Sequence, residues 1–560
     1  MEGIDGYRFA NEDTMKFMRR DYLLPEQTLD QRVTEIGDTV ERILGKPGFS
    51  AKFKEYMKKG WISLSTPMWT NFGTSRGLSI SCFGSYITDD IDSIFDTVSE
   101  VGKMSKLGGG TSAYFGNLRP RGAKITNNGS SSGSVHFMQL FENVTNIISQ
   151  GSTRRGSFAA YLPVEHPDLG EFLTIRDDGS PLRDISFAVT IPDKWMEDMV
   201  AGDADKRSVW AKIIESRIYK GYPYIMFHDT VNNKKPDVYV DKELVITHSN
   251  LCSEILLPTN PNESFVCNLS SLNLLHYDEW RDSDVVEVVV QLLDASMTEF
   301  VEKARKIKFM ERAANFAERH RALGIGVLGW HSYLQSKMIP FESKEAFEET
   351  EEIFSIIAQR AEAESCRMAE EYGEPELLKG YGRRHSTLMA IAPTKSSSFI
   401  LGQVSEGIEP IHSNYFVKDT AKGKYTLRNL QLEKLLEDKG KNSEDVWKSI
   451  MQNSGSVQHL DFLSDEEKAV FLTFRELDQE IIIDQAALRQ KYIDQTQSLN
   501  VIFPTGTPAK KISDIYISAW RKGIKTLYYQ LGTSAAQEFS KSLKSSSRDV
   551  VADECAACSL

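Results

Sequence analysis

The sequence predicts an α/β protein, arranged either as layers or as a barrel. Between residues 61 and 190, short β-rich runs such as SISCFGSYI and ISFAVTIP alternate with helical segments and with loops rich in glycine and serine. The chain has 560 residues, of which 41% are hydrophobic and 26% are charged. This length and composition allow several average domains or one large α/β barrel with additions.

The expected regions follow one another in a simple order. Residues 1–60 are predicted to be a small helical region, because LPEQTLDQRVTEIGDTVERIL carries apolar residues at helical spacing. Residues 61–532 carry the α/β alternation, with long amphipathic helices and a polar insertion at 411–480. After residue 532 the apolar period is lost, so we expect residues 533–560 to form a flexible tail.

The composition excludes several classes of function. A net charge of −13, from 66 basic and 79 acidic residues, argues against bulk binding to nucleic acid or to an anionic membrane. The first residues lack the pattern of a signal peptide, and no apolar run is long enough to cross a bilayer, so we expect a cytoplasmic protein. Six cysteines in a reducing compartment favour a catalytic or metal-binding role over a disulfide framework.

The densest chemical cluster is NLCSEILLPTNPNESFVCNLSSLNLL at residues 250–275. Asn250, Cys252 and Glu254 alternate, so their amide, thiol and carboxylate could face one ligand. Cys267 begins the following strand, and Cys82 lies at an inward position of another, so two strand thiols could face each other across a pocket. The alternative is a pair of buried strand cysteines with a solvent-facing glutamate.

Two further cysteines, Cys555 and Cys558, lie in the predicted tail with CxxC spacing. Such a pair can form a local disulfide and exchange electrons with another one. A zinc site is the competing interpretation, but it needs two more ligands that the sequence does not offer in a recognisable pattern, so we expect no metal site. A stretch of about 22 residues before Cys555 could extend to roughly 70 Å, far enough to visit an active site.

Glycine-rich and serine-rich segments suggest where a ligand could bind. In STLMAIAPTKSSSFILG an apolar strand runs into Pro393 and a serine run, which predicts either a phosphate site at a helix start or an ordinary serine-capped helix. KLGGGTSAYFG at 106–116 could let backbone approach a ligand, or form a plain turn. RALGIGVLGW contains GxGxxG, but a charged helix precedes it, so we interpret its glycines as tight helix packing rather than a dinucleotide site.

The adjacent Tyr528 and Tyr529 would be strand packing in most proteins. Beside a thiol-based redox site, adjacent phenols can also pass an electron and a proton.

Taken together, these segments resemble the large, catalytic (α) subunit of class I ribonucleotide reductases, from about STPMW to the C-terminus. The segments that carry the resemblance are SC at 81–82, NLCSE at 250–254, VCNLSSLNL at 266–274, PTKSSS at 393–398, TLYYQ at 526–530 and the cysteine-bearing tail. The resemblance implies a ten-stranded α/β barrel of two antiparallel five-stranded halves with a central finger loop.

The same resemblance implies the reduction of ribonucleoside diphosphates to 2′-deoxyribonucleoside diphosphates. Cys252 would become a transient thiyl radical that abstracts the 3′ hydrogen, Glu254 would act as general base, and Asn250 would hold the ribose hydroxyls. Cys82 and Cys267 would supply two electrons and end as a disulfide.

Partners and further sites follow from the resemblance as well. Tyr528 and Tyr529 would relay the radical from a separate small (β) subunit that contains a dimetal centre, and no cofactor would be bound covalently in this chain. Cys555 and Cys558 would reduce the active-site disulfide and be recharged by thioredoxin or glutaredoxin. The family forms α homodimers that bind deoxynucleotide or ATP effectors between subunits.

The resemblance assigns two groups of binding residues. Substrate binding is expected at Ser65, Thr66, Gly109, Thr394, Lys395, Ser396, Ser397 and Ser398. Effector binding is expected at Asp89, Arg119, Gly122, Gln150, Arg154 and Arg155.

The sequence departs from longer family members before STPMW, where roughly 60 residues leave no room for an N-terminal ATP-cone, so dATP inhibition through this chain is not expected. The nearest rival is an adenosylcobalamin-dependent class II reductase, against which the tyrosine pair argues. A nucleotide-binding regulatory protein or a thiol–disulfide exchange protein is the rival from another class, and neither explains the grouping of Asn250, Cys252 and Glu254.

Overall fold

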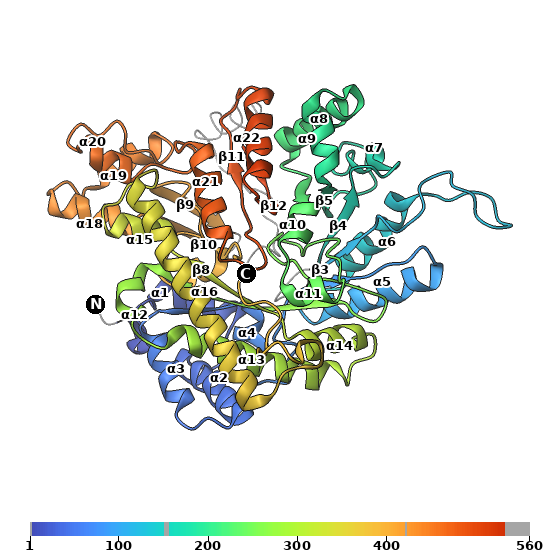
Figure 1. The fold of residues 1–560 in the computed structure, drawn as a ribbon. Helices are drawn as coiled ribbons and strands as arrows, with labels where there is room; N and C mark the ends of the chain where they lie inside the picture. Colours follow the sequence, from blue (N-terminus) through green and yellow to red (C-terminus); the bar gives the residue numbers. More distant parts are fainter. Residues whose placement is uncertain (1–2, 151–155, 421–422, 533–560) are drawn as a thin grey trace.

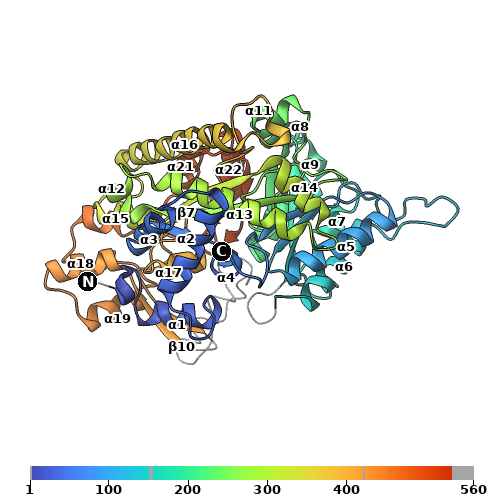
Figure 2. The same cartoon turned by 90° about the horizontal axis from the view of Figure 1, so that it is seen from below.

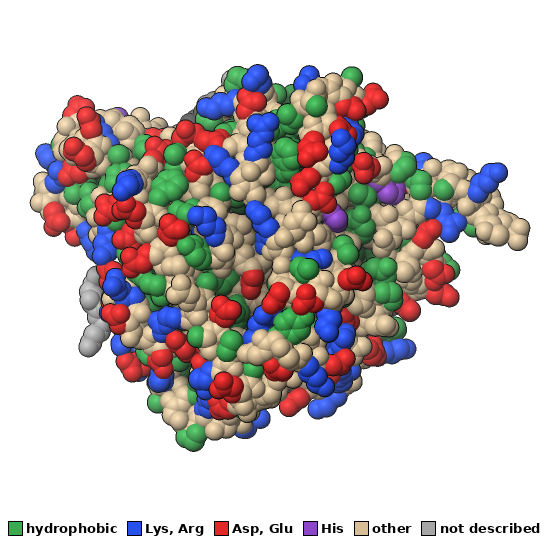
Figure 3. All heavy atoms as spheres, viewed as in Figure 1, with side chains coloured by type: hydrophobic (Ala, Val, Ile, Leu, Met, Phe, Trp, Pro, Cys, Tyr) green, Lys and Arg blue, Asp and Glu red, His purple; other side chains and the backbone are tan. Residues whose placement is uncertain are grey.

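The computed structural model describes residues 3–150, 156–420 and 423–532, and helices surround a curled sheet in it (Figures 1 and 2). The predicted tail, with Cys555 and Cys558, and the residues Arg154 and Arg155 therefore lie outside the described residues. None of the described helices is both long and apolar enough to span a bilayer. On the face seen in Figure 3, acidic and basic side chains are interspersed.

Three helices precede the sheet: α1 (Glu12–Asp21), α2 (Leu29–Leu44) and α3 (Phe49–Lys58), of which α2 and α3 pack against each other. Helix α2 begins at Thr28, whose side chain and that of Gln31 cap each other's backbone N–H groups, and it ends at Gly45 in the left-handed conformation. The buried face of α2 contains Val33, Ile36 and Val40, which follow the helical period seen in the sequence.

The first half of the sheet contains five strands that pair in parallel with their neighbours, as alternation of strands and helices predicts. They are β2 (Cys82–Ser85), β3 (Gly110–Tyr114), β4 (Ser157–Pro163), β5 (Ser186–Ile191) and β6 (Tyr224–Phe227). The helices between them are α5 (Ile91–Lys106), α6 (Ser134–Ile147), α7 (Leu169–Phe172), α8 (Asp193–Ala201) and α9 (Ala204–Lys220).

The second half is also parallel. Strand β7 (Phe265–Asn273) pairs with β8 (Leu323–Leu328), and parallel bridges then join Ile325 to Met389 and Ile391 to Gln497. The segment after Gln497 continues into β11 (Val501–Ile502), which pairs in parallel with β13 (Gln530–Leu531).

The two halves meet at two antiparallel seams. At one seam β2 pairs with β7, and at the other β12 (Thr526–Leu527) pairs with β6. Strands β12 and β13 belong to one segment of the chain, which pairs with β6 of the first half and with β11 of the second half. The hydrogen-bonded ladder is therefore continuous around a barrel of two five-stranded halves. This confirms the predicted fold. Strand β1 (Ile62–Leu64) adds to the far end of β7 in antiparallel orientation.

Further helices cover the second half and the ends of the barrel. Helix α13 (Val285–Ala304) is buried along most of its length, and the 29-residue α16 (Lys344–Tyr372) packs across it. The others are α4 (Thr66–Asn71), α10 (His228–Asn233), α11 (Asp237–Asp241), α12 (Tyr277–Trp280), α14 (Glu311–His320), α15 (Trp330–Ser336), α17 (Lys395–Ile400), α21 (Gln479–Gln490) and α22 (Ala509–Arg521), with short 3-10 helices at Ile4–Gly6, Leu274–His276 and Glu376–Leu378.

The polar insertion forms a lobe at the left of Figure 1. It contains the antiparallel strands β9 (Tyr415–Thr420) and β10 (Gly423–Arg428) and the helices α18 (Leu430–Asp438), α19 (Glu444–Gln452) and α20 (Asp465–Val470). A hydrophobic cluster of its own, which includes Trp447 and Phe471, holds this lobe together.

The first two glycines of the GxGxxG segment, Gly324 and Gly326, lie in β8, so the prediction that they serve helix packing is wrong; Gly329 follows the strand and precedes α15. A Cβ on Gly324 would lie 2.5 Å from Leu269 Cδ2 and 3.2 Å from Cys267 Sγ, and one on Gly326 would lie 2.8 Å from the Ala390 carbonyl oxygen. These glycines allow neighbouring strands of the barrel to approach each other.

Candidate active site

A buried loop between α11 and β7 carries the central group of predicted catalytic residues. An antiparallel bridge between Ser249 and Leu256 closes this loop, whose tip is Leu251–Ser253. Asn250, Cys252 and Glu254 are each at most 1% exposed. Polar residues of three types at a loop tip would normally face solvent, so their burial indicates that the loop lies inside the barrel.

Hydroxyl groups from both halves of the barrel hold the loop tip. Tyr161 on β4 donates to the Asn250 carbonyl at 2.8 Å, whereas from the second half Ser498 donates to the Cys252 carbonyl at 2.6 Å. Thr526 on β12 donates to the carbonyl of the residue after Cys252 at 2.9 Å. Because the barrel holds three carbonyls of the loop tip, those of residues 250, 252 and 253, it sets the position of the Cys252 thiol.

The Asn250 side chain connects the loop to a strand thiol. Its Oδ1 accepts from the backbone N–H of Glu254 at 3.0 Å and of Ile255 at 3.2 Å, which fixes the amide orientation. Its Nδ2 donates to Cys82 Sγ at 3.7 Å. Asn250 therefore links the backbone of the loop at Glu254 to the thiol of Cys82.

Glu254 is a buried carboxyl with one oxygen available. Its Oε2 accepts from Ser498 Oγ at 3.3 Å, whereas its Oε1 has no hydrogen-bond partner among the described residues. Burial raises the pKa of Glu254 to about 7, although hydrogen bonds involving Asn250 and Ser498 act in the opposite direction. A carboxyl with this pKa can take up and release a proton near neutral pH.

Cys82 and Cys267 occupy directly opposite positions in the antiparallel register of β2 and β7. The Cα atoms of such pairs are about 4.5 to 5.5 Å apart, which is within the range that a disulfide spans. Both thiols are buried, and burial raises the pKa of Cys267 even though Gln495 Nε2 donates to its sulfur at 3.4 Å. The seam thus places two thiols where they can be oxidised together.

Gln495 is a site residue that the sequence did not reveal. Its Nε2 also donates to the Leu323 carbonyl at 2.9 Å and to Thr387 Oγ1 at 3.1 Å, and its Oε1 accepts from the loop residue Leu256 at 3.0 Å. It therefore links the sulfur of Cys267 to the loop that carries Cys252. The run DQTQS at 494–498 has the composition of a surface loop, and only the structure shows that residues 495–498 are buried.

The tyrosine pair lies on the second seam. The ring centroids of Tyr528 and Tyr529 are 4.2 Å apart, and Tyr224 on β6 lies 4.6 Å from Tyr528 and 5.1 Å from Tyr529. Tyr528 is buried and Tyr529 is partly exposed. Since Thr526 on the same segment contacts the loop tip, the pair leads from the edge of the protein toward Cys252.

The predicted substrate segments meet at one place. Helix α4 begins after Ser65 and α17 after Thr394, and Ser397 Oγ lies 3.4 Å from the carbonyl oxygen of Leu64. Thr394 adopts φ of 53° and its Oγ1 accepts from Gly407 N at 2.7 Å. Two helix starts with their hydroxyls therefore lie side by side, which is a suitable arrangement for an anion.

Other members of the substrate group are already engaged within the protein. Ser398 Oγ contacts Thr394 Oγ1 at 3.1 Å and the Ser405 carbonyl at 3.3 Å. A Cβ on Gly109 would lie 2.5 Å from the Phe83 ring, so strand packing is sufficient to require this glycine. Ser396 and Ser397 are buried on the same short helix, and Thr66 contacts Tyr22 at 3.2 Å.

Comparison with known proteins decides the family. The model of the ribonucleotide reductase barrel domain matches residues 80–206, 198–377 and 375–530. The chain belongs to the ribonucleotide reductase family. A putative ribonucleoside-diphosphate reductase large subunit of Frog virus 3 is 38% identical over 92% of this chain and 93% of its own length. The α subunit from Chlamydia trachomatis is 30% identical over 84% of this chain and 53% of its own length.

A solved structure agrees with this assignment. The class Id ribonucleotide reductase α subunit of Actinobacillus ureae is 48% identical, with a TM-score of 0.90, over 96% of this chain and 99% of that one. The chain is thus a class I large subunit and a ribonucleoside-diphosphate reductase, in agreement with the resemblance seen in the sequence.

The predicted effector residues of this ribonucleotide reductase lie in two places. Asp89 and Arg119 form an ion pair of 2.5 Å beyond the C-terminal ends of β2 and β3, and Gly122 lies in the loop that follows. Gln150 lies before β4 and donates to Asn71 at 3.2 Å, at the N-terminal ends of the parallel strands. Within one chain the structure therefore separates Gln150 from Asp89, Arg119 and Gly122.

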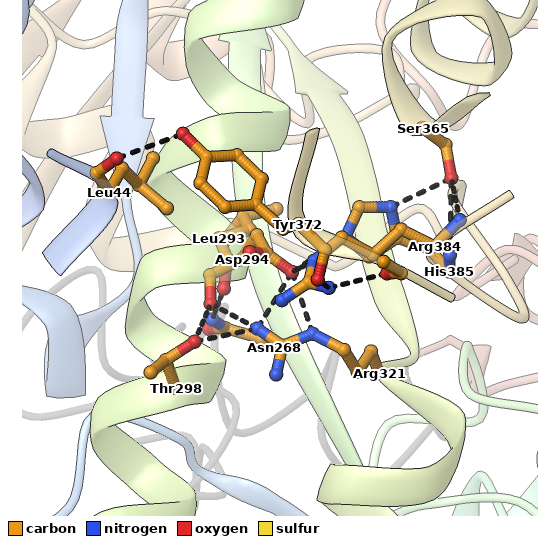
Figure 4. A network of polar contacts seen from close by, with 11 residues as sticks. Leu44, Asn268, Leu293, Asp294, Thr298, Arg321, Ser365, Tyr372, Arg384 and His385 are labelled. Atoms are coloured by element: carbon orange, nitrogen blue, oxygen red, sulfur yellow. Dashed lines mark hydrogen bonds and ion pairs between the residues drawn. The ribbon is translucent and has the colours of Figure 1, made fainter. Parts of the chain in front are cut away.

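A buried charged network supports the second half of this ribonucleotide reductase (Figure 4). The Asp294 carboxylate on α13 accepts from Arg321 Nε at 2.7 Å, Arg384 Nε at 2.9 Å and His385 Nε2 at 3.0 Å. Burial would raise the pKa of Asp294, but the charges of Arg321, His385 and Arg384 outweigh it and hold the pKa well below its usual range. The network joins α13 to the ends of β8 and of the strand segment at Met389.

Proposed function

We propose that this subunit reduces ribonucleoside diphosphates by a radical mechanism in which Cys252 carries a thiyl radical. The observation that carries the proposal is the grouping of Cys252, Asn250 and Glu254 on one buried loop, with Cys82 contacted by the same loop through Asn250. A plain thiol exchange protein would not need the carboxylate, and a regulatory nucleotide-binding protein would not need the thiols.

We assign each residue to the step of the reduction that its environment suits. Cys252 abstracts the 3′ hydrogen of the ribose, Glu254 takes the 3′-hydroxyl proton, and Asn250 holds the ribose hydroxyls. The 2′-hydroxyl leaves as water while Cys82 and Cys267 lose two electrons and two protons and become a disulfide. Cys252 then returns the hydrogen to C3′. The balance is one diphosphate and two thiols giving one deoxy diphosphate, one disulfide and water.

We place the substrate diphosphate where α4 and α17 begin. Ser65 and Thr66 supply one helix start, and the segment from Thr394 to Ser398 supplies the other, with Lys395 as a nearby positive charge. The Gly109 backbone is the remaining expected contact. Support comes from the contact between Ser397 and Leu64, which joins the two segments.

A class I α subunit pairs with a small β subunit that supplies the radical. We propose that the radical enters through Tyr529 and Tyr528 and passes to Cys252. The close contact of the two tilted tyrosine rings and the partial exposure of Tyr529 support this direction. After each turnover, Cys555 and Cys558 would reduce the active-site disulfide and be recharged by thioredoxin or glutaredoxin in the cytoplasm.

We also propose a homodimer that binds a deoxynucleotide or ATP effector. Helices α5 and α6 project from one side of the molecule in Figures 1 and 2, and they expose Ile91, Phe95 and Ile147. A two-fold axis across α5 would place the Gln150 end of one copy beside the Asp89 and Arg119 end of the other. Arg154 and Arg155, which lie outside the described residues, remain expected effector-binding residues.

The decisive experiment is CDP reduction by the purified chain, with ATP and a thiol reductant, in the presence and absence of a class I β subunit. We expect deoxy-CDP only when the β subunit is present, and none from Cys252→Ser, which tests the thiyl site without removing the fold. Turnover by Cys252→Ser would disprove the proposed mechanism. Turnover with adenosylcobalamin and no β subunit would disprove the proposed radical entry.

A further inference from the structure

A third phenol touches the outer tyrosine of the proposed relay. The hydroxyl oxygens of Tyr222 and Tyr529 are 2.9 Å apart, and the two rings meet edge to face with centroids 5.1 Å apart. Tyr222 is only 4% exposed, whereas Tyr529 is partly exposed. Ring packing alone does not require two phenol oxygens to meet at this distance, so the contact is a hydrogen bond with a defined geometry.

The environment of Tyr222 restricts how it can be oxidised. The guanidinium carbon of Arg176 lies 4.7 Å from the centre of the Tyr222 ring. Arg176 is held there because its Nε donates to the Ile185 carbonyl at 3.1 Å and its other nitrogen to the Asp184 carbonyl at 2.9 Å. A fixed positive charge over the ring opposes loss of an electron that would leave a phenol radical cation.

Loss of the electron together with the proton avoids this charge. The hydrogen bond to Tyr529 gives the proton a direct path, and a neutral phenoxyl radical on Tyr222 does not repel the guanidinium. On its other side the Tyr222 oxygen lies 3.2 Å from Ser186 Oγ, and its ring stacks on Phe187 with centroids 5.2 Å apart. Both contacts hold the oxygen in place toward Tyr529.

We propose that Tyr222 is a third redox-active tyrosine, which exchanges a hydrogen atom with Tyr529. The inference rests on the proposed relay through Tyr529. In the step, the O–H bond of Tyr222 breaks and an O–H bond forms on the Tyr529 phenoxyl, so one electron and one proton cross together. Tyr529 is reduced to phenol, Tyr222 is oxidised to a neutral phenoxyl, and no other acceptor is needed.

The exchange gives the radical a protected resting place. Because Tyr222 is more buried than Tyr529, a radical held there is less accessible to reductants in solution. Tyr222 is a branch on the outer side of the relay, since its hydrogen bond is to Tyr529 and Tyr528 is the inner member of the pair. Blocking the inner step should therefore leave the branch intact.

The test replaces Tyr222 with 3-aminotyrosine, which is easier to oxidise and traps a radical with its own paramagnetic resonance spectrum. The full chain is mixed with the β subunit, CDP and ATP, frozen rapidly and measured. We expect an aminotyrosyl radical at position 222. The signal should vanish when Tyr529→Phe is added, and it should persist when Tyr528→Phe is added.

Two further measurements separate the inference from the relay on which it rests. Aminotyrosine at position 529 should trap a radical in its own right. A radical at 529 with none at 222 would overturn the role of Tyr222 alone, and no radical at either position would overturn the relay as well. A signal at 222 that survives Tyr529→Phe would also overturn the exchange, because it would need another path.

Removal of the phenol hydroxyl gives an independent readout. Tyr222→Phe should lower kcat about five-fold, the effect of one neutral hydrogen bond, with little change in KM for CDP. Tyr333→Phe is the matched control, because it loses one phenol hydrogen bond, to Glu349 at 2.8 Å, far from the relay. An unchanged kcat in Tyr222→Phe would contradict the proposal.

Discussion

Replacing Glu254 with glutamine should strongly reduce activity and at the same time stabilise the protein at neutral and alkaline pH. The substitution keeps the size of the side chain but removes the carboxylate that we propose takes the 3′-hydroxyl proton. Since positioned general bases contribute about 10²- to 10⁴-fold to rates, turnover should fall by that factor. In the unmodified enzyme, kcat/KM should rise with pH through about 7, because the proposed base Glu254 can accept a proton only as the carboxylate.

The effect on stability follows from the direction of the pKa shift. Burial raises the pKa of Glu254 from 4.5 to about 7, so the folded chain keeps a proton that the unfolded chain releases. The stability that this proton contributes is complete below pH 4.5 and is lost as the pH rises through about 7. The loss amounts to about 3 kcal/mol, and glutamine, which does not titrate, escapes it.

The assay measures the urea midpoint of the unmodified chain and of Glu254→Gln at pH 5 and pH 8. The advantage of the variant should grow by about 2 kcal/mol between these values. Glu263→Gln is the control of opposite sign: burial would raise the pKa of Glu263, but His320 and Arg319 outweigh it and lower it to about 2. Glu263→Gln should be less stable than the unmodified chain at both pH values. A pH-independent difference for Glu254→Gln would refute the role of burial, and retained turnover would refute the role as base.

Three further substitutions test separate parts of the structure. Gln495→Met removes the N–H that contacts Cys267 and leaves the Leu256 N–H without its acceptor. We expect the free energy of unfolding to fall by about 1 to 3 kcal/mol and prereduced enzyme to form deoxy-CDP more slowly in a single turnover. Gln497→Met, which does not contact the thiols, should keep the single-turnover rate. Gly324→Ala brings a Cβ within 2.5 Å of Leu269 and should lower the free energy of unfolding by about 1 to 3 kcal/mol, whereas Gly170→Ala, with nothing within 4 Å, should be neutral in urea titrations. Phe95→Asp should convert the proposed dimer to monomer in sedimentation velocity. Met451→Asp, which changes an exposed apolar residue in the lobe of the polar insertion, should not. A dimer that survives Phe95→Asp would exclude α5 from the interface.

Sequence patterns predicted an α/β fold, either as layers or as a barrel, through local signals that the tertiary structure preserves. The strand runs around Cys82 and Ile185 are strands because their β-branched and aromatic residues pack on both faces of a parallel sheet. The error at Gly324 has a clear origin. Two glycines within six residues weaken a strand pattern, and the reason for them lies in Leu269 and Ala390, which are distant in sequence.

The predicted site residues differ in how much of their setting the sequence could reveal. Alternation of Asn250, Cys252 and Glu254 is a local pattern, so their common loop could be predicted. The exact opposition of Cys82 and Cys267 depends on strand register across 185 positions, which no local pattern specifies. Gln495 could not be found, because its role arises only from burial within the barrel.

The two antiparallel seams explain why the proposed redox residues lie where they do. In antiparallel pairing, residues face each other directly, so a seam can bring two side chains from distant segments into contact. One seam pairs Cys82 with Cys267, and the other brings Tyr224 and the segment of Tyr528 together. The loop with Cys252 connects them, through Asn250 to the first seam and through Thr526 to the second.

Because of this arrangement, the placement of the two thiols depends on the register between β2 and β7. A slip of one residue at the β2–β7 seam would turn Cys82 to the opposite face from Cys267 without removing a single strand. Glycines such as Gly324, which bring β8 close behind Cys267, and the charged network around Asp294 therefore act on the chemistry by fixing the register of the second half. Asp294→Asn, which weakens three buried contacts, should lower both the urea midpoint and the yield of the Cys82–Cys267 disulfide on mild oxidation, measured by thiol labelling and peptide mapping. A lower midpoint with an unchanged disulfide yield would show that register is fixed elsewhere.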